Sequence, residues 1–137
     1  MNNLKGKRKM RAETLVGRMT RQEALMVIAI HANKPFCSPG EAICAQNIER
    51  LVNLCQGHPL FEESAEDIRK RINRLVNMEH MHGQMSLLQK AVETLPAELH
   101  PTALDWVGKM LEPQSIADSA KKEILKKLAQ LLQSKVP

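Results

Sequence analysis

The residue types best suited to metal chemistry gather between residues 78 and 85, in the order Met-Glu-His-Met-His-Gly-Gln-Met. Thioether and imidazole groups together can hold a soft or borderline metal such as Cu(I). On a helix, Met78, His82 and Met85 share a face, whereas His80 points elsewhere. Methionine also fills gaps in cores poor in aromatic residues, and this chain has two Phe, one Trp and no Tyr. We therefore expect Met81, Met85 and Leu88 to pack inward and the histidines to be exposed or to cap the helix break at Gly83.

A nucleophilic centre would need a Cys or Ser beside a His and an orienting acid. Cys37, which is close in sequence to His31, is the one candidate of this kind. Cys44 and Cys55 fall on or near the apolar side of a helix, where a thiol serves as a small hydrophobic group. The chain contains no GxSxG, phosphate-binding glycine loop or HExxH motif. The sequence therefore predicts a protein that is not an enzyme, with no catalytic residue and no cofactor.

Capping patterns mark where the helices that carry these residues begin. In a capping box, a Ser or Thr side chain accepts from a backbone N–H three residues on, and an acidic side chain there reaches back. Three such pairs occur: Thr20 with Glu23, Ser38 with Glu41, and Ser64 with Asp67. They predict helices over residues 20–32, from 38 to Gly57, and from 64 to about Gly83.

Proline divides the second half of the chain. The residue before a proline avoids the α region, so the Leu95–Pro96 pair ends a fourth helix at Thr94. Further helices are predicted over residues 102–111, stopped by Pro113, and from Ser115 or Asp118 to Gln133. No stretch alternates as a strand would, so the sequence predicts an all-α, compact single-domain bundle of about six helices.

The two ends of the chain look like one unit used twice. Residues 20–55 and 102–133 each consist of an apolar helix, a loop and an amphipathic helix, and Ala24–Leu25 aligns with Ala103–Leu104. This pattern indicates two pseudo-symmetric helix–loop–helix halves that pack as mates. The predicted core comprises Leu25, Ile28, Ile48, Leu51, Ile72, Leu75, Leu88, Leu104, Trp106, Leu125 and Leu128.

Segments of both halves resemble the TerB-like proteins, which are named from tellurite-resistance operons. The likeness is carried by Leu87–His100 followed by Thr102–Leu104, and by Glu23–Ala32 followed by Ser38–Glu41. It covers residues 20–134 and leaves a basic leader, residues 1–19, outside. The resemblance implies a helical domain that serves a stress-response or chemical-resistance system through contacts with a protein partner.

The TerB-like signature is an Ala-Asp-Gly loop followed by a helix-opening Glu in each half, and these acids are thought to hold a divalent cation. Hard cations need several carboxylate oxygens. The first loop of this chain reads Ala-Asn-Lys, and Lys121 falls at the position of the second Glu. We therefore expect degenerate loops and no metal site. The alternative is a divalent-cation sensor that uses the remaining candidates, Asn33, Glu41, Glu112 and Asp118.

The net charge of +5 is concentrated at the start of the chain, because residues 1–22 carry +6 and the remainder sums to −1. Blocks of like charge are often disordered tails, and they can also bind polyanions. The candidate contacts to an anionic membrane or a nucleic acid are Lys5, Lys7, Arg8, Lys9 and Arg11. A second basic feature, predicted to lie opposite the leucines of the last helix, comprises Lys121, Lys122, Lys126 and Lys127.

Three cysteines without CxxC spacing predict no disulfide framework, and no apolar run is long enough to span a bilayer. The expected location is therefore the cytoplasm, with the surface of the inner membrane as a peripheral alternative. A polyanion binder acting through the leader is a further alternative function, and a solvated tail is the simplest interpretation of the leader itself.

Overall fold

The computed structural model describes residues 19–33, 45–82 and 84–134, except the side chains of residue 33 and residues 79–85. The helices are α2 (Arg21–Asn33), α3 (Ala45–Gln56), α4 (Ala65–His82), α5 (Gln84–Thr94), α6 (His100–Leu111) and α7 (Asp118–Ser134), with a 3-10 turn, η2 (Ala97–Leu99), before α6. These residues contain no strand, so the all-α prediction is confirmed. The boundaries predicted near residues 20, 32, 64, 94, 111 and 133 are correct to within one residue. The predicted helix start at Ser38 with Glu41 lies outside the described residues.

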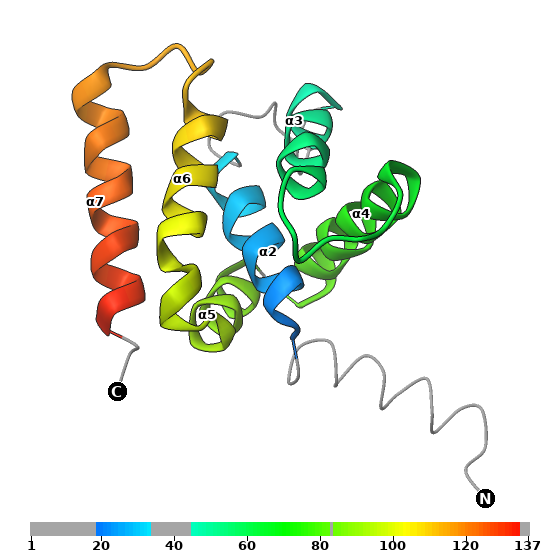
Figure 1. The fold of residues 1–137 in the computed structure, drawn as a ribbon. Coiled ribbons are helices and arrows are strands. Elements are labelled where there is room, and N and C mark those ends of the chain that lie inside the picture. The colour runs from blue at the N-terminus through cyan, green and yellow to red at the C-terminus, as the bar shows by residue number, and fades with distance from the viewer. Residues whose placement is uncertain (1–18, 34–44, 83, 135–137) are drawn as a thin grey trace, which may run out of the picture.

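Helix α2 is the centre of the molecule (Figure 1). It packs mainly on α5 and α6, and also contacts α4 and α3. Every side chain from Glu23 to Ile30 is buried. The sequence explains this position, because a helix that is apolar on all sides must be covered on all sides.

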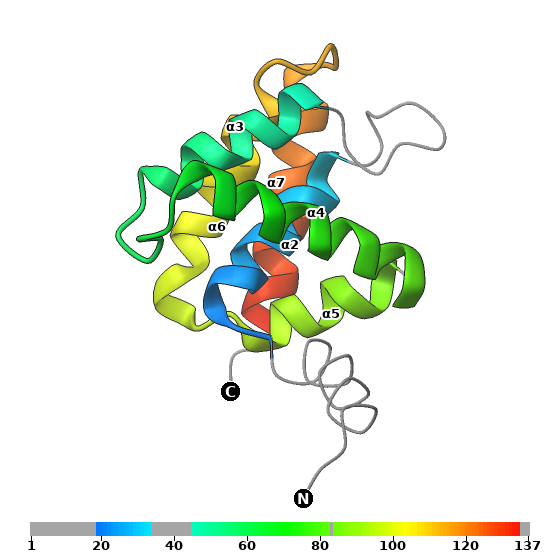
Figure 2. The ribbon, with the colours of Figure 1, turned by 90° about the vertical axis from the view of Figure 1, so that its right-hand side faces the viewer.

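Helices α3 and α4 pack against each other and run in front of α2 in the view of Figure 2. Their exposed sides are joined by an ion pair, in which Arg69 Nη2 donates to Glu49 Oε1 at 2.6 Å. The hydrogen bond from Arg69 holds the pKa of Glu49 below its usual value. Because the pair faces water, its contribution to stability is small.

Helices α6 and α7 form an antiparallel pair on the other side of α2 (Figure 1). Their close approach occurs at Gly108, where the Cβ atom of any larger residue would lie 3.9 Å from Leu125 Cδ1. Leu132 is the one fully covered side chain of α7, whereas Ile124, Leu125 and Leu128 are only partly buried. Helix α7 is therefore anchored from one side.

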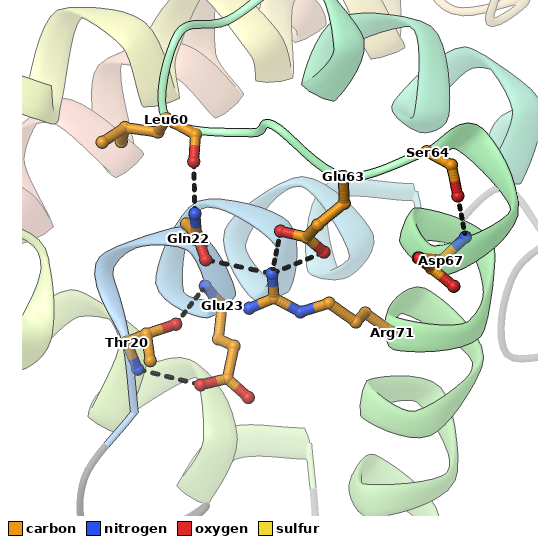
Figure 3. Close-up of polar contacts among 8 residues, drawn as sticks. All are labelled: Thr20, Gln22, Glu23, Leu60, Glu63, Ser64, Asp67 and Arg71. Atoms are coloured by element: carbon orange, nitrogen blue, oxygen red, sulfur yellow. Dashed lines mark hydrogen bonds and ion pairs between the residues drawn. The ribbon is translucent and has the colours of Figure 1, made fainter.

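The start of α2 is held by the predicted capping box (Figure 3). Glu23 N–H donates to Thr20 Oγ1, and Thr20 N–H donates to Glu23 Oε1, both at 3.0 Å. At the start of α4, Asp67 N–H donates to Ser64 Oγ at 3.2 Å. Both helix starts predicted from these pairs are confirmed.

A polar network ties the loop between α3 and α4 to α2 (Figure 3). Arg71 Nη1 donates to Glu63 Oε1 at 2.7 Å and to Gln22 Oε1 at 3.0 Å. The amide of Gln22 donates in turn to the carbonyl of Leu60. One guanidinium on α4 thus links the loop to the central helix.

The predicted core needs one correction. Buried as predicted are Leu25, Ile28, Leu51, Ile72, Leu75, Leu88 and Trp106. Ile48, Leu104, Leu125 and Leu128 are only partly buried and pack against that core. The apolar face of a helix can be read from the sequence, but the number of neighbours that cover the face cannot.

The equivalent helices of the two predicted halves, α2 and α6, pack on each other. Helix α7 packs closely on α6, whereas the described part of α3 packs mainly on α4 instead of α2. The superposition of the two halves stays a prediction. None of the helices in the described ranges combines the length and apolar character needed to cross a bilayer.

Candidate binding groove

An apolar hollow of about 290 Å³ opens between α2 and α7, and we call it the α2–α7 groove. These two helices pack on α6 rather than on each other, which leaves the space between them uncovered. Its lining comprises Ile28, His31 and Ala32 of α2, Leu88 of α5, Val107 of α6, and Ile124, Lys127, Leu128 and Leu131 of α7.

Helix periodicity places these side chains on two facing walls. Ile124, Leu128 and Leu131 follow the i, i+4, i+7 pattern that puts residues on one face of a helix. Ile28 and Ala32, four residues apart on α2, do the same on the opposite wall. Each wall is therefore a short aliphatic ridge.

The groove leaves aliphatic surface in contact with water. Among the large hydrophobic side chains that the structure describes, Leu131 is the exposed one, with 37% of its surface accessible. Removing apolar surface from water makes the free energy of association more favourable by about 25 cal/mol for each Å² that is covered. The volume lies at the lower end of the roughly 300–1,000 Å³ of small-molecule pockets, so the groove suits a few apolar side chains better than a whole cofactor.

One cation stands at the rim of the groove. Lys127 is exposed and, among the described residues, has no hydrogen-bond or ion-pair partner. This position corrects the predicted lysine stripe, since Lys127 borders the leucines instead of lying opposite them. Lys121 also departs from the stripe, because its Nζ donates to the carbonyl of Glu112 at 2.9 Å.

The structure brings two predicted cation ligands, Glu112 and Asp118, to the same hollow beside the α6–α7 turn. Lys121 and Lys122 line that hollow as well. The ammonium group of Lys121 donates to the carbonyl of Glu112, so a positive charge already lies beside these two acids. The described residues contain no group of three or more His, Cys, Asp or Glu side chains that could hold a metal ion.

Several predicted site residues fall where the structure gives no side-chain description. Leu88 is buried as predicted, and Met78 is buried as well, but the side chains of residues 80, 81, 82 and 85 are among those not described. The same holds for Asn33, whose backbone ends α2. Outside the described residues altogether lie Cys37, Cys44, Glu41 and the leader residues Lys5, Lys7, Arg8, Lys9 and Arg11.

A second hollow, of about 450 Å³, lies between α3 and α6 and has a mixed polar and apolar lining. Three of its polar side chains are engaged locally: Lys109 pairs with Asp105 at 3.1 Å, and His58 Nδ1 accepts from Leu60 N–H at 3.2 Å. The ring of Trp106 lies 5.9 Å from that of His58, measured between centroids. The contact between the His58 and Trp106 rings joins the α3–α4 loop to α6, so these two residues have a structural role.

Sequence reasoning did not identify Leu131 as a site residue, and it placed Lys127 in a basic stripe opposite the leucines. A signal for them was present in α7, whose apolar residues cover two adjoining faces. Leu125 and Leu132 belong to one face, and Ile124, Leu128 and Leu131 to the other. The sequence does not show which of these two faces the neighbouring helices cover.

No protein-family model, curated protein or solved structure matches the chain.

Proposed function

We propose that this chain is a non-enzymatic, TerB-like interaction module of a stress-response or chemical-resistance system, and that it binds a partner protein through the α2–α7 groove. The observation that carries the proposal is the aliphatic ridge of Ile124, Leu128 and Leu131, which faces a hollow and is only partly covered. The resemblance of residues 20–134 to TerB-like proteins supports the biological setting.

A partly covered aliphatic ridge beside a hollow is well suited to binding another protein. Binding energy at protein interfaces is concentrated in a few side chains that enter desolvated pockets. A hollow with aliphatic walls and a charged rim has this arrangement of apolar centre and polar edge. An incoming side chain would be buried against the aliphatic walls of the groove, whose titratable side chains are those of His31 and Lys127.

The test is to place a charge in the groove without unfolding the helix. We expect Leu131→Lys to remain folded, because the site is exposed enough for the ammonium to reach water while its methylene groups stay against the wall. Proteins cross-linked to the wild-type chain in native lysate should be lost from this variant. Circular dichroism and the urea midpoint would verify that the fold is retained.

Gln133→Lys is the matched control, since it adds the same charge to the same helix at an exposed position on the opposite face. It should capture the same proteins as the wild type. Equal capture by Leu131→Lys and the wild type would exclude the groove as the contact surface.

A further inference from the structure

We infer that the α2–α7 groove receives an α-helix of the partner, with aliphatic anchors about one turn apart and an acidic side chain opposite Lys127. This inference rests on the proposed function and adds the conformation and the charge of the partner segment. It follows from the chemistry of the walls, their length and the position of Lys127.

The walls require a partner segment that satisfies its own backbone. Seven of the nine lining residues are aliphatic, the other two being His31 and Lys127. An extended peptide would bring N–H and C=O groups that need partners, and aliphatic side chains supply none. A helix pairs these groups internally, so it can lie against the groove without leaving them unpaired.

The length of the groove sets the spacing of the anchors. Ile124 and Leu131 are seven residues apart on α7, which corresponds to about 10 Å, or two helical turns. Ridges formed by residues four apart, such as Ile28 with Ala32 and Ile124 with Leu128, are those that interdigitate when helices pack. The incoming helix should therefore present aliphatic residues at i and i+4, or at i and i+3, to fit between them.

Lys127, at the rim of the groove, indicates which charge the partner segment should carry at that point. Lys127 lines the groove and has no acidic partner among the described residues. A helix seated beside it would partly desolvate the ammonium group, and a carboxylate at that point would offset the loss. A basic residue there would be repelled, so Lys127 selects acidic sequences.

The experiment is a selection of displayed random 16-residue peptides on the full chain, with binders to Leu131→Lys removed. Enriched peptides are synthesised, and their affinities are measured by fluorescence anisotropy against the wild type, Lys127→Glu and Gln133→Lys. We expect aliphatic pairs at helical spacing, an Asp or Glu within one turn of them, and helix formation on binding. Lys127→Glu should weaken binding about 3- to 10-fold, and Gln133→Lys should not.

Charge reversal gives the decisive comparison. Replacing the acidic residue of a selected peptide by Lys should weaken binding to the wild type and restore it to Lys127→Glu. Enrichment of extended or proline-rich peptides, absence of any enrichment, or failure of the charge exchange would overturn the inference. If one of these three outcomes were found while Leu131→Lys still lost the captured proteins, the inference of a helical partner segment would be wrong. The proposed function, protein binding through the groove, would stand. Unchanged capture would reject the proposed function itself.

Two other possible occupants of the groove, a second copy of this chain and a small amphiphile, are tested with the same protein preparation. Analytical ultracentrifugation that showed a dimer of the wild type, dissociated by Leu131→Lys, would identify a second copy of this chain as the occupant. Saturable binding of dodecanoate, abolished by Leu131→Lys, would identify a small amphiphile. Either result would overturn the inference of a partner helix, and a monomer without dodecanoate binding would support it.

Discussion

Cys55 is a thiol placed as a hydrophobic side chain, with 0% of its surface exposed. Burial, the largest cause, raises the pKa of the Cys55 thiol to about 12, and nearby Arg71 opposes this shift. Nucleophilic thiol chemistry requires the thiolate, so the environment of Cys55 keeps it unreactive. This agrees with the sequence-based interpretation of Cys55 as a core residue.

The raised pKa predicts how stability depends on pH. Below the unfolded-state value of 9.0 the thiol is protonated in both states, and between 9 and about 12 only the unfolded chain loses the proton. The contribution of Cys55 is therefore complete below pH 9 and falls by up to about 1.4 kcal/mol per pH unit above it. Urea unfolding at pH 8 and pH 10 should show a free energy of unfolding that decreases by about 1 kcal/mol more for the wild type than for Cys55→Ala.

Both proteins should carry Cys37→Ser and Cys44→Ser, so that Cys55 is the one thiol present. In this background a thiol reagent should modify native Cys55 at least about 100-fold more slowly than the unfolded chain. Rapid labelling of the native protein, or the same pH dependence with and without Cys55, would contradict the buried thiol.

The loop between α3 and α4 is positioned by contacts to other helices. Arg71 lies on α4 and is 16% exposed, and its guanidinium contacts Glu63 of the loop and Gln22 of α2. On the other side, the ring of Phe61 lies 5.8 Å from that of Trp106, between centroids. The loop is therefore held against both α2 and α6.

Arg71→Ala should therefore destabilise the fold. The change leaves Glu63, which is 28% exposed, without its cation and removes the donor to Gln22. We expect a loss of about 1–3 kcal/mol in the free energy of unfolding, measured by urea denaturation, and faster amide exchange in residues 57–64. Arg74→Ala, an exposed arginine one turn along the same helix, is the control and should change stability by about 0.5 kcal/mol or less. Equal effects of the two substitutions would show that the network is not stabilising.

At the scale of the whole molecule, the net positive charge is concentrated in a different part of the sequence from most of the hydrophobic core. Its buried hydrophobic residues form one cluster, whereas residues 1–22 carry more than the entire net charge. Positive charge concentrated in one segment attracts polyanions and releases their counterions on binding. Binding of a polyanion by the leader stays a prediction, and it needs a test of its own.

If the leader binds polyanions, its affinity must depend on salt. For a 20-base-pair DNA duplex, five phosphate contacts would give a slope of about −4.5 in log K against log salt concentration. Changing Lys5, Lys7, Arg8, Lys9 and Arg11 to Gln should abolish most of that slope, as measured by fluorescence anisotropy. Lys122→Gln with Lys126→Gln, on the exposed face of α7, is the control. Identical binding by the wild type and the leader variant would make the leader a solvated tail.

Local signals were sufficient to predict the helices. Thr20 with Glu23 and Ser64 with Asp67 mark helix starts because capping is decided within four residues of the chain. The Leu95–Pro96 pair and Pro113 mark helix ends for an equally local steric reason. The burial of α2 was also predictable, since its sequence has no polar side to expose. These features need no knowledge of how distant segments meet.

The groove depends on how the helices are arranged in space. The sequence shows that Ile124, Leu128 and Leu131 share a face of α7, but their exposure arises because α2 and α7 both pack on α6 and leave a space between them. Lys127 lines the groove because it lies at the edge of that face. Lys121 is not part of the predicted basic stripe, because its ammonium group donates to the carbonyl of Glu112 at the end of α6. Such placements result from packing among segments far apart in the chain, and patterns within one helix do not contain them.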